Sequence, residues 1–148
     1  MVKRILFVCL GNICRSPSAE AVVMRMAAER GLELELDSAG TGDWHVGEPP
    51  YGPMQAAGRA RGYDLSQLRA RQVSVSDFND FDMILAMDGQ NLRDLRALQP
   101  EGARAELGMF TQHLNGGDVP DPYHTRDFDG ALALVEEAAE RLLDALVS

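Results

Sequence analysis

Residues 8–17, which read VCLGNICRSP, constrain the fold and the chemistry of this chain more than any other segment. They follow the apolar run of residues 5–8, which is typical of a buried strand, and Ser16-Pro17 is typical of the start of a helix. Cys9 is therefore expected at the end of a strand and Arg15 beside the start of a helix, with a short loop between them. Such a loop can direct a thiol, several backbone N–H groups and one guanidinium toward a single oxyanion.

Apolar runs that suit strands alternate along the chain with segments that suit helices. The predicted strands cover residues 4–9, 32–38, 82–87 and, with the weakest pattern, 105–110. The predicted helices run from about residue 16 to Gly31 and over residues 53–61, 89–98 and 127–147, the last capped by Asp127 or Asp129. This alternation predicts an α/β fold with a four-stranded parallel sheet and helices on both faces. Ligands bind beyond the carboxyl ends of the strands in such sheets, which is where Cys9 would lie.

Composition limits the class of protein and its partners. The 148 residues suit a single domain over residues 1–148, and the 45% apolar and 25% charged fractions are ordinary for a soluble protein. No apolar stretch approaches the ~20 residues that span a bilayer. The first apolar run resembles a signal peptide, but it is short and Asn12 and Arg15 follow it, so we expect a strand and a cytoplasmic protein. The net charge of −9 argues against nucleic acid as a partner.

The cysteines and histidines do not form a metal-binding pattern. Cys9 and Cys14 are too few for a disulfide framework or a structural zinc site. The three histidines, His45, His113 and His124, are distant from both cysteines in the sequence. We therefore expect no metal and no cofactor.

The loop residues suit nucleophilic chemistry on an anion. A helix that starts near Ser16 directs its positive end toward Cys9 and favours the thiolate, and the Ser16 hydroxyl could cap the helix as well as donate to the sulfur. Arg15 offers a planar fork of donors that matches two phosphate oxygens; a surface arginine is the alternative, but a cation is unfavourable in a first helical turn. Gly11 and Asn12 tolerate left-handed backbone, which an inward-facing loop needs and which a plain turn would also use.

Transfer of a phosphoryl group to a thiolate also needs a proton donor for the departing alkoxide or phenolate. The proline-rich loop of residues 115–123 supplies two candidates, Asp118 and Asp121. Pro120 and Pro122 stiffen the backbone around Asp121, but an ordinary surface turn uses the same residue types. Spacing alone leaves the functional and the structural interpretation open.

Three blocks of the sequence together resemble one known family. Residues 9–17, Asp37-Ser38-Ala39-Gly40-Thr41 and Asp121-Pro122-Tyr123 are similar to motifs of the low-molecular-weight protein tyrosine phosphatases, and the resemblance extends over essentially the whole chain. It implies a three-layer, flavodoxin-like fold. It also implies hydrolysis of phosphotyrosine and small aryl phosphates through a Cys9 thiophosphate, without a cofactor.

The resemblance also implies roles for individual residues. Cys9 would be the nucleophile, Arg15 the phosphate and transition-state ligand, and Asp121, rather than Asp118, the general acid. The residues implied in substrate binding are Leu10, Gly11, Asn12, Ile13, Cys14, Ser16, Trp44 and Tyr123. Ser38 and Asp88 would support the loop. Cys14 would in addition be a redox partner that forms a reversible disulfide with Cys9.

The chain departs from the family pattern at three places. Leu68 stands near the position of a histidine that commonly supports the loop asparagine, Tyr51-Gly52-Pro53 replaces an Asp-x-Arg segment, and His124 replaces a second tyrosine. We expect these changes to affect substrate preference more than the chemistry.

Other functions are less consistent with the sequence. An arsenate reductase of the thioredoxin-coupled type needs two further cysteines, and no cysteine follows Cys14. A non-catalytic phosphate-binding module would not need Cys9, Arg15 and Asp121 together, and no Gly-Lys-Ser/Thr follows the loop as in a nucleotide-binding protein. The expected partners are a phosphotyrosine-containing protein and a cognate tyrosine kinase, and the chain is expected to be a monomer, with a weak dimer as the alternative.

Overall fold

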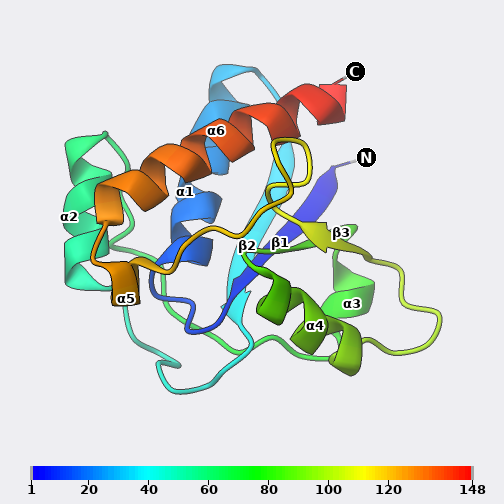
Figure 1. Ribbon diagram of the computed structural model, residues 1–148. Helices are drawn as coiled ribbons and strands as arrows, with labels where there is room; N and C mark the ends of the chain where they lie inside the picture. The colour runs from blue at the N-terminus through cyan, green and yellow to red at the C-terminus, as the bar shows by residue number, and fades with distance from the viewer. Residues whose placement is uncertain (1, 148) are drawn as a thin grey trace.

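A parallel four-stranded sheet forms the centre of the molecule in the computed structural model, which describes residues 2–147 (Figure 1). Its strands are β1 (Lys3–Cys9), β2 (Leu34–Gly40), β3 (Met83–Ala86) and β4 (Glu106–Met109). They lie in the order β2-β1-β3-β4 and each neighbouring pair is parallel. The predicted α/β fold with a four-stranded parallel sheet is confirmed.

Six helices accompany the strands in the described part of the chain. They are α1 (Arg15–Glu29), α2 (Gly52–Ala60), α3 (Asp77–Asp80), α4 (Gly89–Leu98), α5 (Pro122–Thr125) and α6 (Phe128–Val147). Helices α1 and α6 pack on each other and on one face of the sheet, with α2 against α6, whereas α3 and α4 lie on the other face (Figure 1). Within residues 2–147, no helix is long and apolar enough to cross a membrane.

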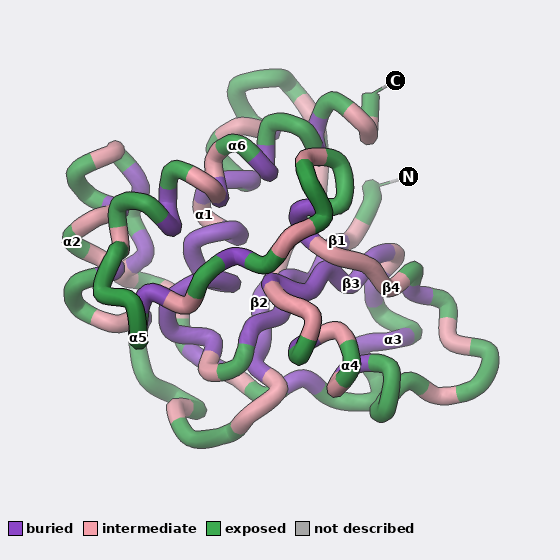
Figure 2. Tube along the Cα trace, viewed as in Figure 1, coloured by how far each residue is buried: buried purple, intermediate pink, exposed green. Residues whose placement is uncertain are grey.

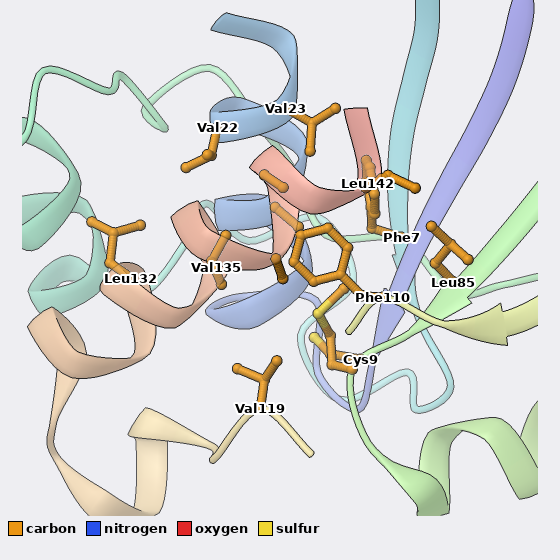
Figure 3. Close-up of a cluster of buried hydrophobic side chains, with 14 of the residues drawn as sticks. Phe7, Cys9, Val22, Val23, Leu85, Phe110, Val119, Leu132, Val135 and Leu142 are labelled. Atoms are coloured by element: carbon orange, nitrogen blue, oxygen red, sulfur yellow. The ribbon is translucent and has the colours of Figure 1, made fainter. Parts of the chain in front are cut away.

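The central strand β1 contributes to the core on both faces of the sheet. Ile5 and Phe7 point toward α1 and α6, and Leu6 and Val8 toward α3 and α4, because successive side chains of a strand alternate between faces. All four side chains are fully buried, and Figure 2 shows buried residues concentrated along the strands. Figure 3 shows part of the cluster that faces α1 and α6, which we call the first core cluster; it includes Cys9, the last residue of β1. The loop that follows Cys9 therefore starts from the buried centre of the fold.

The observed elements differ from the expected ones in their bounds. The second strand begins at Leu34 rather than at residue 32, because the Leu32 N–H still bonds to the Ala27 carbonyl and so belongs to the end of α1. It extends to Gly40 because that residue pairs with Cys9 of β1. The one-turn helices α3 and α5 were not expected. Of the two candidate caps for α6, Asp127 accepts the Gly130 N–H at 2.9 Å.

Candidate active site

The loop between β1 and α1 lies at the carboxyl edge of the sheet. Cys9 ends β1 and Arg15 begins α1, as the sequence pattern indicates. The end of β2 approaches this loop so closely that a Cβ on Gly40 would lie 2.6 Å from the Leu10 carbonyl oxygen. Glycine at position 40 is therefore required for the loop to sit against the neighbouring strand.

The Cys9 sulfur is held by two groups of the loop and helix. The Asn12 N–H donates to it over 3.2 Å, and Asn12 has the left-handed conformation, with φ of 56°, that was expected of it. The Ser16 Oγ lies 3.0 Å from the sulfur. The expectation that Ser16 also caps the helix is wrong: the N-cap is Cys14, without a side-chain bond, so Ser16 is the second residue of α1. Its hydroxyl is engaged by the sulfur instead.

Asn12 connects the loop to the rest of the sheet edge. Its Nδ2 donates to Ser16 Oγ at 2.7 Å and to Ser38 Oγ at 3.0 Å, and its Oδ1 accepts the Arg71 backbone N–H at 3.0 Å. The asparagine is thus fully bonded without a histidine at position 68. Leu68 is half-buried and packs against the first core cluster instead.

Arg15 is buried and oriented by acceptors on two sides. Its Nη1 donates to Asp88 Oδ2 at 2.7 Å and to the Val119 carbonyl at 3.0 Å. The other Asp88 oxygen caps α4 by accepting the Asn91 N–H at 2.7 Å. Burial alone would lower the pKa of Arg15, but the charge at Cys9 and the bond to Asp88 raise it above its ordinary value, so the guanidinium stays charged.

The two candidate acids occupy different places. Asp121 lines the same cavity as Cys9 and Arg15, and its Oδ2 lies 3.5 Å from the Arg15 Nη2. Its Oδ1 accepts the Tyr123 N–H at 3.1 Å, which fixes the carboxylate at the start of α5. Asp118 instead accepts the Gly89 N–H at 2.9 Å and does not line the cavity. Tertiary structure therefore brings Asp121, and not Asp118, to the cysteine.

The cavity has a volume of about 260 Å³ and mostly apolar walls. Of the expected binding residues, Asn12 and Ser16 do not line it but support it from behind, as do Ser38 and Asp88. His45 and His124 were not expected in the wall. The residues that line it are Cys9, Leu10, Gly11, Ile13, Cys14, Arg15, Trp44, His45, Asp121, Tyr123 and His124.

Tyr51, one of the departures from the family pattern, ties the cavity wall to α2 and α6. Its ring packs on Tyr123 at 5.1 Å and on Phe128 at 5.9 Å between ring centroids. Its backbone N–H donates to the Ile13 carbonyl at 2.9 Å, and its hydroxyl accepts from Arg126. Residue 51 therefore positions both the loop and the Tyr123 side of the wall.

Cys14 is the second thiol of the site. Burial, with further contributions from the charges at Cys9 and Asp121, raises the pKa of the Cys14 thiol to about 12. It therefore stays protonated at neutral pH and does not compete with Cys9 as a nucleophile. Among residues 2–147, no group of three or more histidine, cysteine, aspartate or glutamate side chains is arranged to hold a metal ion.

Comparison with known proteins gives one family. Residues 4–148 match the family model described as low molecular weight phosphotyrosine protein phosphatase. The chain belongs to this family. It is 42% identical to the low molecular weight protein-tyrosine-phosphatase YfkJ of Bacillus subtilis, over 96% of this chain and 94% of that protein. It is 44% identical to the Schizosaccharomyces pombe member, over 82% and 81% of the two chains.

Solved structures of relatives have the same fold. The crystal structure of YfkJ superposes with a TM-score of 0.93 at 40% identity, over 99% of this chain and 95% of that one. The structure of a Drosophila arginine phosphatase gives a TM-score of 0.91 at 32% identity, over 97% and 98%. The three-layer, flavodoxin-like architecture expected for this phosphatase is confirmed.

Sequence reasoning missed Glu20, a buried carboxyl behind the phosphatase loop. Glu20 Oε1 accepts a hydrogen bond from Ser38 Oγ at 2.7 Å, and Ser38 in turn accepts from Asn12. Glu20 stands three and seven positions before Val23 and Ala27, on the apolar side of α1, and this placement was the signal that could have revealed it. Burial raises the pKa of Glu20 to about 7; the nearby Asp37 acts in the same direction, and Ser38 and Arg71 oppose it.

The Glu20 carboxyl makes stability depend on pH. Because its pKa is higher in the folded than in the unfolded chain, its favourable contribution is complete below about pH 4.5 and is lost as pH rises through about 7. We expect Glu20→Gln to remove this loss, because glutamine does not titrate. The difference in the free energy of unfolding, variant minus natural chain, should therefore be about 3 kcal/mol larger at pH 8 than at pH 4. Urea unfolding at several pH values measures it. Parallel stability curves for the two proteins would show that Glu20 does not titrate in this range.

Proposed function

We propose that this chain, as a single domain over residues 1–148, hydrolyses phosphotyrosine and small aryl phosphates through a Cys9 thiophosphate. The observation that carries the proposal is that Cys9, Arg15 and Asp121 meet along one cavity, with Asp121 3.5 Å from the Arg15 guanidinium. A nucleophile, an anion ligand and an acid are the three groups that phosphoryl transfer to a cysteine requires.

In the first step, the Cys9 thiolate attacks phosphorus. The S–P bond forms as the P–O bond to the tyrosine oxygen breaks, and Asp121 donates its proton to the departing phenolate. Arg15 donates to two phosphate oxygens; Asp88 and the Val119 carbonyl hold its Nη1, which orients the fork toward the cavity. The backbone N–H groups of the loop and the first turn of α1 stabilise the remaining negative charge.

In the second step, the Asp121 carboxylate takes a proton from water, whose oxygen attacks phosphorus. The S–P bond breaks, inorganic phosphate forms, and the electron pair returns to the Cys9 sulfur. Ser16 Oγ and the Asn12 N–H, at 3.0 and 3.2 Å from that sulfur, stabilise the leaving thiolate.

The cavity wall favours an aromatic substrate. Leu10, Ile13, Trp44 and Tyr123 present apolar surface around the position of the phosphate, and Tyr123 packs on Tyr51. An aryl ring can stack between these side chains. Because one structural relative is named an arginine phosphatase, phosphoarginine is the competing substrate class.

Substrate comparison tests the reaction. With excess chelator, we expect the chain to release phosphate from a phosphotyrosine peptide and from p-nitrophenyl phosphate, and much more slowly from a matched phosphoarginine peptide. Preference for phosphoarginine would contradict the proposed substrate, and dependence on added metal would contradict the proposed mechanism.

Asp121→Asn should lower turnover in a way that depends on the leaving group. We expect a loss of about a hundred- to a thousandfold in kcat on a phosphotyrosine peptide, because the phenolate then departs without a proton. The loss should be clearly smaller on aryl phosphates with very acidic leaving groups. Steady-state kinetics over a series of such esters measures it.

Asp118→Asn is the matched control for this experiment. It is the same substitution in the same loop, but Asp118 bonds to the Gly89 N–H and does not line the cavity. Equal losses for all esters in Asp121→Asn, or an equal loss in Asp118→Asn, would assign the acid elsewhere.

The Cys14 thiol suits a protective role. After oxidation of Cys9 to the sulfenic acid, Cys14 can attack that sulfur, so that an S–S bond forms, the S–O bond breaks and water leaves. The sequence has no cysteine beyond Cys14, so the further relay of a thioredoxin-coupled arsenate reductase is not supported.

The biological setting follows from the reaction. The substrate is a phosphotyrosine-containing protein, and a cognate tyrosine kinase would supply it. We place the chain in the cytoplasm and expect it to act as a monomer, with a weak dimer as the alternative.

A further inference from the structure

A second hollow lies beside the active-site cavity, and the two share a wall. Its volume is about 490 Å³, and Leu10 and Trp44 line both. The rest of its lining comes from the segment after β2, the segment before α3 and one side of α4. We call this hollow the flank groove. None of the steps above uses it.

Trp44 forms the partition between cavity and groove. A Cβ on Gly42 would lie only 2.0 Å from the Trp44 ring, so the indole rests directly on the backbone at Gly42. Its side chain nevertheless remains 68% exposed. A large apolar surface is thus held at the rim of the active site, with one hollow on each side of it.

The flank groove has an apolar surface that nothing in the described part of the chain covers. Val75 is 49% exposed and Leu98 is 39% exposed, and both line the groove together with Leu10 and Trp44. Contiguous exposed apolar side chains of this kind mark binding surfaces.

We propose that the flank groove binds an apolar side chain of the substrate polypeptide within three residues of the phosphotyrosine. The inference rests on the proposed phosphotyrosine hydrolysis, because a phosphotyrosine in the cavity brings its backbone to the rim formed by Leu10 and Trp44. An extended chain advances ~3.3 Å per residue, so nearby side chains pass over that rim into the groove.

The charge of the flank groove also affects which peptide sequences it can bind. Asp94 is the one charged residue that lines the flank groove within the described chain, and its Oδ1 accepts from Gln90 without any cation beside it in the groove. An acidic flank would meet this carboxylate and the net charge of −9. Apolar flanks are therefore favoured over acidic ones.

A double variant and matched peptides test the proposal. Phosphotyrosine peptides would carry leucine, serine or aspartate at the second and third positions on either the amino or the carboxyl side. For one of these sides, we expect kcat/KM to be about tenfold higher with leucine than with serine, chiefly through a lower KM. Burial of an aliphatic side chain supplies enough free energy for a tenfold change in binding. Val75→Glu combined with Leu98→Glu should remove the preference. Turnover of p-nitrophenyl phosphate, which does not reach the groove, should not change.

Met24→Glu is the matched control. Met24 is 51% exposed on α1 and lines neither the cavity nor the groove, so a glutamate introduced there, with one added negative charge instead of two, should leave the leucine preference intact. A preference for leucine that survives the double variant, or no preference on either side, would overturn the proposal. So would variants that change the sedimentation of the chain but not peptide turnover, because they would assign the groove to a second copy. If no phosphotyrosine substrate is hydrolysed at all, the proposed function has failed; hydrolysis without a leucine preference refutes the groove alone.

Discussion

Cys9→Ser is expected to reduce turnover of every aryl phosphate below detection, a loss of more than about ten-thousandfold, because a serine hydroxyl does not ionise near neutral pH and cannot replace the thiolate. The sulfur lies among hydrogen-bonding groups of the loop and helix. The Asn12 N–H and the Ser16 hydroxyl direct donors at it, and the start of α1 adds the positive end of its dipole. Phosphate release from p-nitrophenyl phosphate measures the loss.

The variant should keep its fold and its affinity for phosphate. Serine is nearly isosteric with cysteine, and Arg15 and the loop amides remain, so inorganic phosphate should still raise the melting temperature. Cys14→Ser is the matched control, with the same substitution five positions away; we expect it to stay within about tenfold of the natural chain, because its protonated thiol takes no part in the transfer. Substantial turnover in Cys9→Ser would rule out the thiophosphate.

Arg15→Lys is expected to lower kcat/KM by about a thousandfold while the positive charge is kept, because the ammonium cannot donate to two phosphate oxygens in one plane. The geometry of the site leaves little room for another cation at position 15. Arg15 is 3% exposed, and its Nη1 is already committed to Asp88 and the Val119 carbonyl. A lysine cannot keep these bonds and reach the substrate as well. Steady-state kinetics on a phosphotyrosine peptide measures the effect.

Asp88→Asn removes the negative charge beside Arg15 but keeps an oxygen that can orient the guanidinium. The amide oxygen can still accept from Arg15 or from the Asn91 N–H, so we expect a loss of about tenfold, much smaller than for Arg15→Lys. Thermal unfolding should be followed in both variants, because breaking a buried ion pair also destabilises the fold. A lysine variant that is folded and nearly as active would remove Arg15 from the transition state.

The loop could be predicted because its parts are neighbours in the sequence. A strand, a loop and a helix start follow one another within residues 5–17, and local backbone preferences decide each of them. The prediction that Ser16 caps the helix was wrong, although it also rested on neighbouring residues. Serine is a common helix cap, but the Ser16 hydroxyl bonds to Cys9 and Asn12 instead. The N-cap is Cys14, two positions before the expected Ser16, and the helix begins at Arg15.

The choice between the two candidate acids could not be made from spacing. Asp118 and Asp121 lie in one proline-rich loop, and either could have faced the cysteine. The structure separates them because the loop runs past the end of β3, where the Val119 N–H bonds to the Met87 carbonyl. That contact directs Asp118 toward α4 and leaves Asp121 beside Arg15.

The sequence by itself determined the α/β class and the strand–loop–helix arrangement that joins Cys9 to Arg15, since both depend on residues close together in the chain. Only the tertiary structure decided what surrounds the loop. Asn12 meets Arg71 from 59 positions away and Arg15 meets Val119 from 104, and Glu20 reaches Ser38 across two elements. Such contacts depend on which strands pair and which helix faces pack, and burial of the whole core fixes these together. The same is true of the flank groove, whose walls come from segments that meet only when the sheet has formed.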